Sequence, residues 1–197
     1  APTGPYTKSF TTGSSITVHN NFSVTAIGGT NDNRLTVNLV DNTIIDNNGN
    51  GIFTLGANTT LSSTGVTSLH NSIGSAANAG SGSFHGGKNL DPASIVRYAS
   101  TTATQTIAYA ADLDYGSIDF IGDRDKRAIG AMTIKGNVTA SANTPIFIDG
   151  GFEHKVAGDW QLRTTNYGPA IRNDVTSVYS TGKITLNGQL QNIGVSG

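Results

Sequence analysis

Acidic residues gather in the middle of the chain, and carboxylates can bind a metal ion or transfer a proton. The segment reads DLDYGSIDFIGDRDKR. Its acidic residues are Asp112, Asp114, Asp119, Asp123 and Asp125, and Lys126 and Arg127 follow directly. Three interpretations of this acidic segment are open.

The first interpretation is a Ca²⁺ site, because hard cations take several oxygen ligands from one short loop. Asp112, Asp114 and Gly116 resemble the start of a calcium loop, and Asp119 is a further candidate ligand. The glutamate that normally closes such a loop is missing. Ca²⁺ is therefore the only cofactor that the sequence suggests.

The second interpretation is a carboxylate pair for glycoside hydrolysis, which needs two acidic groups on either side of the scissile bond. Asp112 and Asp114 would share one face of a strand, and Asp119 would project from another level. Asp123 completes the candidate catalytic set. This interpretation predicts a polysaccharide-degrading enzyme.

The third interpretation is a solvated turn, GDRDKR, in which opposite charges neutralise one another. Matches this short arise often without function. We therefore predict that the chain is not an enzyme and has no catalytic residue, with a glycan hydrolase or lyase as the alternative.

Aromatic side chains suggest a different kind of site, because their rings pack against apolar faces and are favoured at interfaces. The candidate glycan-binding residues are Trp160, Tyr167, Tyr179 and His85. His85 lies in SFHGGK, where glycines would let a ligand approach the backbone. The alternative is that the rings fill a thin core or a seam between chains, and that His85 is polar surface.

The other histidines, His19, His70 and His154, show no spacing typical of a zinc site. Residues 153–155, with His154 in the middle, are expected at an exposed strand edge or turn.

Short β-branched runs separated by Asn, Asp and Gly must position these candidates. The segment RLTVNLVDNTIIDNNGNGIFTLGANTTL, from Arg34 to Leu61, shows this pattern most clearly. The units TVHN, TVNL and FTLG recur about 18 to 19 residues apart, which is near the short end of solenoid repeats. The pattern predicts an all-β chain of β-solenoid-like or sandwich-like strands with Asn/Gly turns.

The pattern also predicts a division of the chain. Residues 1–13 read as a linker or leader, 14–68 as a β-rich repeat-like region, 69–91 as a Gly/Ser/Ala-rich loop or hinge, and 92–197 as a second β-rich region. At most one short helix is expected, with Asp91 as its N-cap and Pro92 in its first turn.

Composition restricts the partners. Hydrophobic residues make up 36% of the 197 residues and charged residues 13%, with a net charge of -1 and no cysteine. So little apolar material predicts small stacked rungs or an intertwined homotrimer that buries a seam. A near-neutral charge argues against nucleic acid as a partner, and no apolar run is long enough for membrane insertion.

The segment DWQLRTTNYGPAIRNDVTSVYSTGKITLNGQLQN, from Asp159 to Asn192, resembles bacteriophage tail fibres and tailspikes. The resemblance lies in Ile171 to Asp174 followed by Tyr179, and in the strand and turn from Thr181 to Gly188. It implies a virion structural protein, a homotrimer that contacts other virion proteins and attaches to a bacterial surface polysaccharide or receptor.

The resemblance leaves open whether the chain is a shaft, a tip or a capsid decoration protein. A bacterial β-solenoid adhesin is a further alternative, because adhesins share the Asn/Gly/Thr-rich composition of the first half. The expected location is therefore the virion, or alternatively the bacterial cell surface or the secreted fraction.

Overall fold

The computed structural model describes residues 6–11, 15–26, 35–46, 50–74, 84, 86–140, 147–162, 171–172, 182–188 and 193–194. In these residues strands predominate, and one short helix, α1 (Ser68–Ile73), accompanies them. The all-β prediction with at most one short helix is confirmed.

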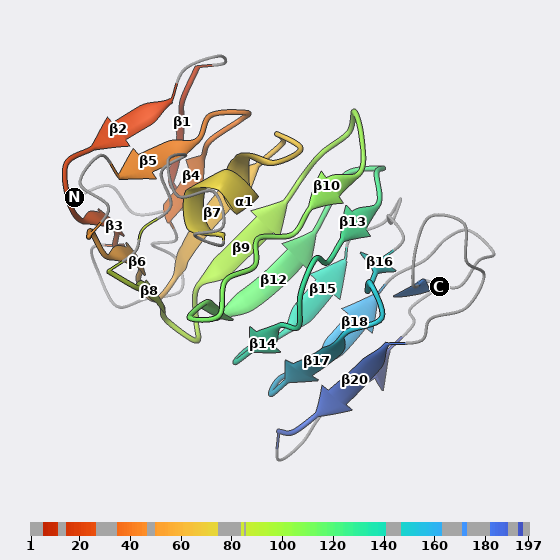
Figure 1. Cartoon of the computed structure of the whole chain (residues 1–197). Helices are drawn as coiled ribbons and strands as arrows, with labels where there is room; N and C mark the ends of the chain where they lie inside the picture. Colours follow the sequence, from red (N-terminus) through yellow and green to blue (C-terminus); the bar gives the residue numbers. More distant parts are fainter. Residues whose placement is uncertain are drawn as a thin grey trace.

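Every strand pairing in the described residues is parallel, and the strands form five sheets (Figure 1). The largest sheet has eight strands, β1 (Tyr6–Ser9), β4 (Leu35–Asn38), β7 (Thr59–Ser63), β9 (Ile95–Tyr98), β12 (Ser117–Phe120), β15 (Val138–Ala140), β18 (Trp160–Leu162) and β21 (Ile193–Gly194). Two smaller sheets belong to the first part of the chain, with β2 (Ile16–Val18) and β5 (Ile44–Asp46) in one and β3 (Phe22–Val24), β6 (Phe53–Leu55) and β8 (Lys88–Leu90) in the other.

Two four-stranded sheets follow in the second part. One contains β10 (Gln105–Thr106), β13 (Lys126–Arg127), β16 (Phe147–Ile148) and β19 (Ile171–Arg172). The other contains β11 (Asp114–Tyr115), β14 (Thr133–Ile134), β17 (Glu153–Val156) and β20 (Lys183–Leu186).

The chain visits these sheets in a fixed rotation. After each strand of the eight-stranded sheet it adds one element to a second face and one to a third, and then returns to the eight-stranded sheet. We call one such passage a circuit. Ile118 pairs with Val138, twenty positions later, and Val138 pairs with Trp160, twenty-two positions later. Successive strands therefore lie side by side along the molecule, as the green-to-blue part of Figure 1 shows.

The helix α1 takes the place of a strand on the second face. It follows β7 and packs against β5, where the Ser72 Oγ accepts a hydrogen bond of 3.0 Å from the Ile44 N–H. The next element on that face, β10, is joined to the turn before the helix by a hydrogen bond of 2.9 Å from the Thr106 N–H to the Val66 carbonyl. The helix thus covers an edge strand that would otherwise expose unpaired backbone groups.

The repeat predicted from TVHN, TVNL and FTLG is not the repeat of the fold. These units lie in β2, β4 and β6, which belong to three different sheets. Their spacings of 19 and 17 residues take the chain two faces onward and not through a full circuit.

A different repeat does mark the circuits. Glycine, a polar residue and alternating apolar residues recur as GSIDF, GNVTA and GDWQL at β12, β15 and β18. The glycines are Gly116, Gly136 and Gly158, and backbone hydrogen bonds join each to the next, at 2.6 Å and 3.0 Å. A Cβ on Gly136 would lie 2.2 Å from the Ser117 Oγ, so the stacking of these turns requires glycine.

Elements of the structure cross the bounds of the predicted segments. β1 lies in the expected linker of residues 1–13, and α1 and β8 lie in or reach into the expected loop of residues 69–91. The predicted helix after Asp91 is wrong, because Asp91 Oδ1 closes a turn to the Ala93 N–H at 2.8 Å and strand β9 follows. One sheet runs through both β-rich regions, since β7 pairs with β9.

Apolar side chains from the sheets pack together in one buried core. On the eight-stranded sheet the inward row includes Leu61, Val96, Ile118 and Val138, which are fully buried and stacked by strand pairing. Alternation along each strand leaves the intervening residues on the outer face. The single chain therefore builds its own core, within the part that the structure describes.

Candidate ligand-binding groove

The acidic segment does not converge on one centre. Asp112 pairs with the Lys88 Nζ at 3.0 Å, and Asp114 pairs with the Lys135 Nζ at 3.5 Å. Each of these ion pairs joins neighbouring circuits. Asp112 lies in a turn before β11, so it does not share a strand face with Asp114 as the hydrolase interpretation assumed.

Asp123 lies in an exposed turn beside Arg124, with a separation of 3.7 Å between carboxylate oxygen and Nε. This matches the solvated-turn interpretation of GDRDKR at its first aspartate. Among the described residues, no group of three or more His, Cys, Asp or Glu side chains could hold a metal ion. The expected Ca²⁺ ligands Asp112, Asp114 and Asp119 are therefore not brought together.

Asp119 differs from the other three, because it lies on the outer face of the eight-stranded sheet. Its register partners are Arg97 on β9 and Thr139 on β15. Asp119 Oδ2 accepts a hydrogen bond of 2.8 Å from the Arg97 Nε–H, and Oδ1 accepts one of 3.1 Å from the Thr139 hydroxyl. Both oxygens are thus held in place by adjacent strands.

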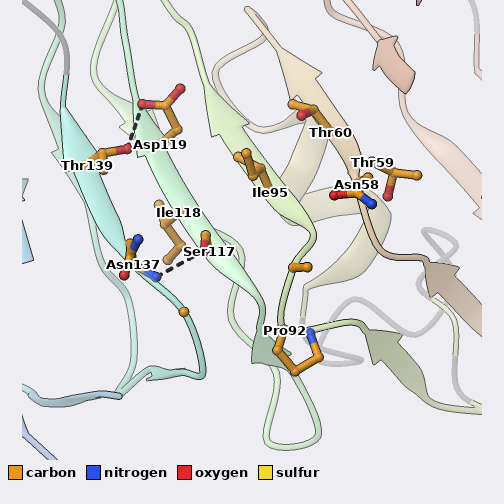
Figure 2. Close-up of a pocket in the computed structure, with 12 residues that line it drawn as sticks. Asn58, Thr59, Thr60, Pro92, Ile95, Ser117, Ile118, Asp119, Asn137 and Thr139 are labelled. Carbon is orange, nitrogen blue, oxygen red and sulfur yellow. Dashed lines mark hydrogen bonds between the residues drawn. The ribbon is translucent and has the colours of Figure 1, made fainter. Parts of the chain in front are cut away.

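Beside Asp119 a groove of about 410 Å³ crosses the outer face from β7 to β15 (Figure 2). It is lined by Asn58, Thr59, Thr60, Pro92, Ala93, Ile95, Ser117, Ile118, Asp119, Gly136, Asn137 and Thr139. These residues come from four neighbouring strands and the turns that precede them. The groove therefore runs across the strands and along the direction in which the circuits stack.

A ladder of side chains holds the polar groups of the groove. The Ser117 Oγ accepts a hydrogen bond of 3.0 Å from the Asn137 N–H (Figure 2). The Asn137 Oδ1 accepts one of 2.8 Å from the Asp159 N–H. Each of these two side-chain oxygens therefore already accepts a hydrogen bond from a backbone N–H of the protein. Neither the Ser117 O–H nor the Asn137 Nδ2–H₂ donates a hydrogen bond to another described residue.

Apolar surface lies next to these polar groups. Ile95 is half-buried in the middle of the groove, and Pro92 and Ala93 are exposed in the turn before β9. The groove therefore presents a mixed surface, with hydroxyl, amide and carboxylate groups around a small apolar patch.

The predicted aromatic platform does not form around Trp160. Its ring is only 5% exposed and meets the Phe147 ring edge-on, with centroids 5.6 Å apart. The prediction of Trp160 as an exposed glycan-binding residue is wrong, and its alternative role as core filling is confirmed. Tyr167, Tyr179 and His85 lie outside the described residues.

His154 is not at an exposed edge, as residues 153–155 suggested, because its ring is fully buried. The His154 Nδ1 accepts a hydrogen bond of 3.3 Å from the Met132 N–H, and Nε2–H donates one of 3.2 Å to the Asp149 carbonyl. In β17 the side chains alternate between exposed and buried, and His154 takes an inward position. The alternation of polar and inward-facing positions in EHKV is the sequence feature that could have indicated this burial.

Acidification is expected to destabilise the protein through His154, whose pKa burial lowers below 6.5. The unfolded chain then takes up a proton that the folded chain excludes, so stability is complete above pH 6.5 and falls as the pH drops below it. Urea unfolding at pH 7.5 and 5.5 measures this loss.

The variants His154→Gln and His19→Gln separate the buried histidine from an exposed one. His154→Gln keeps a donor and an acceptor but does not titrate, so it should lose less stability on acidification. Some loss should persist, because burial also lowers the pKa of His70. An unchanged loss in His154→Gln would contradict the assignment, and His19→Gln should behave like the wild type.

Lys126 is a buried residue that the sequence interpretation placed in a solvated turn. Its side chain is fully buried in β13, and Nζ donates hydrogen bonds to the Arg124 carbonyl at 2.8 Å and the Ser100 carbonyl at 3.4 Å. Burial lowers the pKa of Lys126 to about 8. Only its alternation with the exposed Arg127 signals this inward position.

In the part of the chain that the structure describes, no helix is long and apolar enough to span a bilayer. No protein-family model, curated protein or solved structure matches the chain.

Proposed function

We propose that this chain is a non-catalytic attachment protein, a β-solenoid of the tail-fibre or tailspike type that binds a bacterial surface glycan. The observation that carries the proposal is the groove from β7 to β15, because its lining comes from four neighbouring strands and so extends along the stacking direction. Such a surface suits an extended polymer better than a compact small molecule.

The solenoid assignment is supported by the fixed rotation of the chain through three faces with parallel pairing throughout the described strands. In a solenoid each turn contacts mainly its neighbours, and the stacked turns form a long surface. An antiparallel sandwich, the alternative left by the sequence, would need antiparallel neighbours.

The absence of catalysis is supported by the arrangement of carboxylates. Hydrolysis of a glycosidic bond by the common mechanism needs two carboxyl groups facing each other across the substrate. Asp119 is the only acidic residue among the described residues that line the groove. A polysaccharide-degrading enzyme remains the alternative, since this one carboxylate does lie in the groove.

A homotrimer on the virion fits the same proposal. Because each chain encloses its own apolar core, the three copies would pack side by side and would not need to intertwine. Three sites held together raise avidity without any new contact. A bacterial surface adhesin or a capsid decoration protein would share the fold and differ in location.

The test is binding without cleavage. The purified chain should sediment with bacterial cells that carry the recognised polysaccharide and should not sediment with cells stripped of it. The polysaccharide should keep its length during incubation, measured by size-exclusion chromatography and a reducing-end assay. Shortening that disappears in Asp119→Ala would establish the enzyme instead, and failure to bind cells of any candidate host would remove the proposal.

A further inference from the structure

We infer that the groove binds an uncharged, extended glycan, and that Asp119 and Asn137 determine this selectivity by contacting the sugar hydroxyls. This inference rests on the proposed function and assigns the ligand class and the contacting residues of its groove. Three properties of the groove carry it, namely its charge, its hydrogen-bonding groups and its direction.

The charge of the groove disfavours an acidic ligand. None of the described residues that line it is basic, and Asp119 is acidic. The Arg97 guanidinium contacts Asp119 through Nε at 2.8 Å and so offsets its charge from the neighbouring strand. A uronate or phosphate in the groove would find no cation in the lining to pair with, and the nearest guanidinium, that of Arg97, already pairs with Asp119.

The hydrogen-bonding groups suit sugar hydroxyls, which both donate and accept. A carboxylate has about four acceptor positions, and Asp119 uses two of them for Arg97 and Thr139. The free positions can accept from hydroxyls of the ligand, while the Asn137 Nδ2–H₂ and the Ser117 O–H can donate to them. Because their oxygens are engaged inside the protein, these donors are held in place before the ligand arrives.

The apolar patch of Ile95, Pro92 and Ala93 adds a surface for the C–H face of a sugar ring. A neutral sugar has both such a face and a rim of hydroxyls. The groove offers both kinds of contact side by side.

The direction of the groove favours a glycan over a peptide. Extended peptides bind sheets by pairing with a free edge strand. Here the groove crosses β9 and β12, whose backbone groups are already paired on both sides. Neighbouring strands are about 4.8 Å apart, a spacing close to the length of one sugar unit in an extended chain, so four strands span about 14 Å.

The test uses polysaccharide extracted from the cells that the chain binds, separated by anion exchange into neutral and acidic fractions. Binding is measured by isothermal titration calorimetry with the wild type and three variants. Ala93→Trp places a large side chain in the groove at an exposed position. Asp119→Asn removes the carboxylate, and Asp112→Asn makes the same charge change at an exposed site outside the groove.

The expected result is binding of the neutral fraction, weakened at least tenfold by Ala93→Trp and about tenfold by Asp119→Asn, and unchanged by Asp112→Asn. If Asp119→Asn fails to fold by circular dichroism, Ala93→Trp decides alone. Binding confined to the acidic fraction, binding of an unstructured peptide in the same groove, or neutral binding that both groove variants leave intact would overturn the inference.

These outcomes are distinct from failure of the proposed function. Cell binding that persists while the groove variants have no effect would leave an attachment protein with its site elsewhere. Absence of cell binding would remove the attachment function itself.

Discussion

Phe147→Ala is expected to lower the free energy of unfolding by about 3–5 kcal/mol, the usual cost of truncating a buried phenylalanine. Phe147 is 1% exposed and lies at the centre of an aromatic cluster. Its ring stacks on Phe120 with centroids 5.7 Å apart and meets His154 and Trp160 edge-on at 5.3 Å and 5.6 Å. Alanine would remove all three contacts and leave a cavity between circuits.

Urea unfolding followed by tryptophan fluorescence measures this loss directly. Trp160 is the only tryptophan of the chain and contacts the Phe147 ring, so its emission reports on the circuits concerned. Phe10→Ala is the matched control, because Phe10 is 37% exposed and the same truncation should cost less than about 1 kcal/mol. Equal losses in the two variants would show that the aromatic cluster around Phe147 does not stabilise the circuits that it joins.

The free energy of unfolding is expected to rise by about 2 kcal/mol between pH 7.5 and 10 as Lys126 loses its proton. The size of this rise follows from 1.36 kcal/mol per pKa unit. Burial lowers the pKa of Lys126 from 10.5 to about 8. Between these values the unfolded chain binds the proton and the folded chain does not. Stability therefore rises with pH across this window and is lowest, for this group, below pH 8.

The variant Lys126→Met isolates this contribution, since methionine fills a similar volume without a titratable group. Its stability relative to the wild type should fall by about 2 kcal/mol as the pH rises from 7.5 to 10. Measurements stop at pH 10 because the tyrosines of the unfolded chain ionise there before the buried Tyr98 and Tyr115, whose pKa values burial raises. Lys155→Met, at an exposed position of β17, should follow the wild type at every pH. A Lys126→Met difference that is constant with pH would contradict the account of a buried, desolvated ammonium.

The strand content was predictable from sequence because β-branched runs and Asn/Gly turns act locally. The circuit length was not found, since the repeat that first stands out, TVHN to TVNL to FTLG, joins strands on different faces. The glycine-led repeat at Gly116, Gly136 and Gly158 did carry the circuit length. The three copies of this repeat share only the glycine, the polar residue after it and the apolar character of the inward positions. The equivalence of the copies becomes visible only in the hydrogen bonds between their stacked glycines.

The segment after Asp91 shows a conflict between local and tertiary preferences. An aspartate followed by proline is a good helix start. In the folded chain Val96 and Tyr98 instead fill the inward row between β7 and β12, and both are fully buried. Packing between circuits therefore determines that this segment is a strand, and no local sequence pattern indicates it.

The candidate site could be predicted only in part. Asp119 was among the candidates, but the acidic segment is close in sequence and dispersed in space, because each short strand is followed by a turn to another face. Asp114 lies on β11, Asp119 on β12 and Asp123 in the turn before β13. The groove brings Asp119 together with Asn58 and Asn137, which are distant in sequence and became neighbours through the stacking of circuits.

The most direct test of the central claim, an attachment groove for an extended glycan, is the dependence of affinity on ligand length. Oligosaccharides of one to eight units, prepared from the neutral fraction by partial hydrolysis, are titrated into the chain by calorimetry. The dissociation constant is expected to fall at least tenfold as the ligand grows to about four units, one for each of the four strands, and then to level off. A monosaccharide that binds as tightly as the longest oligosaccharide, or oligosaccharides that are shortened during the titration, would contradict this claim.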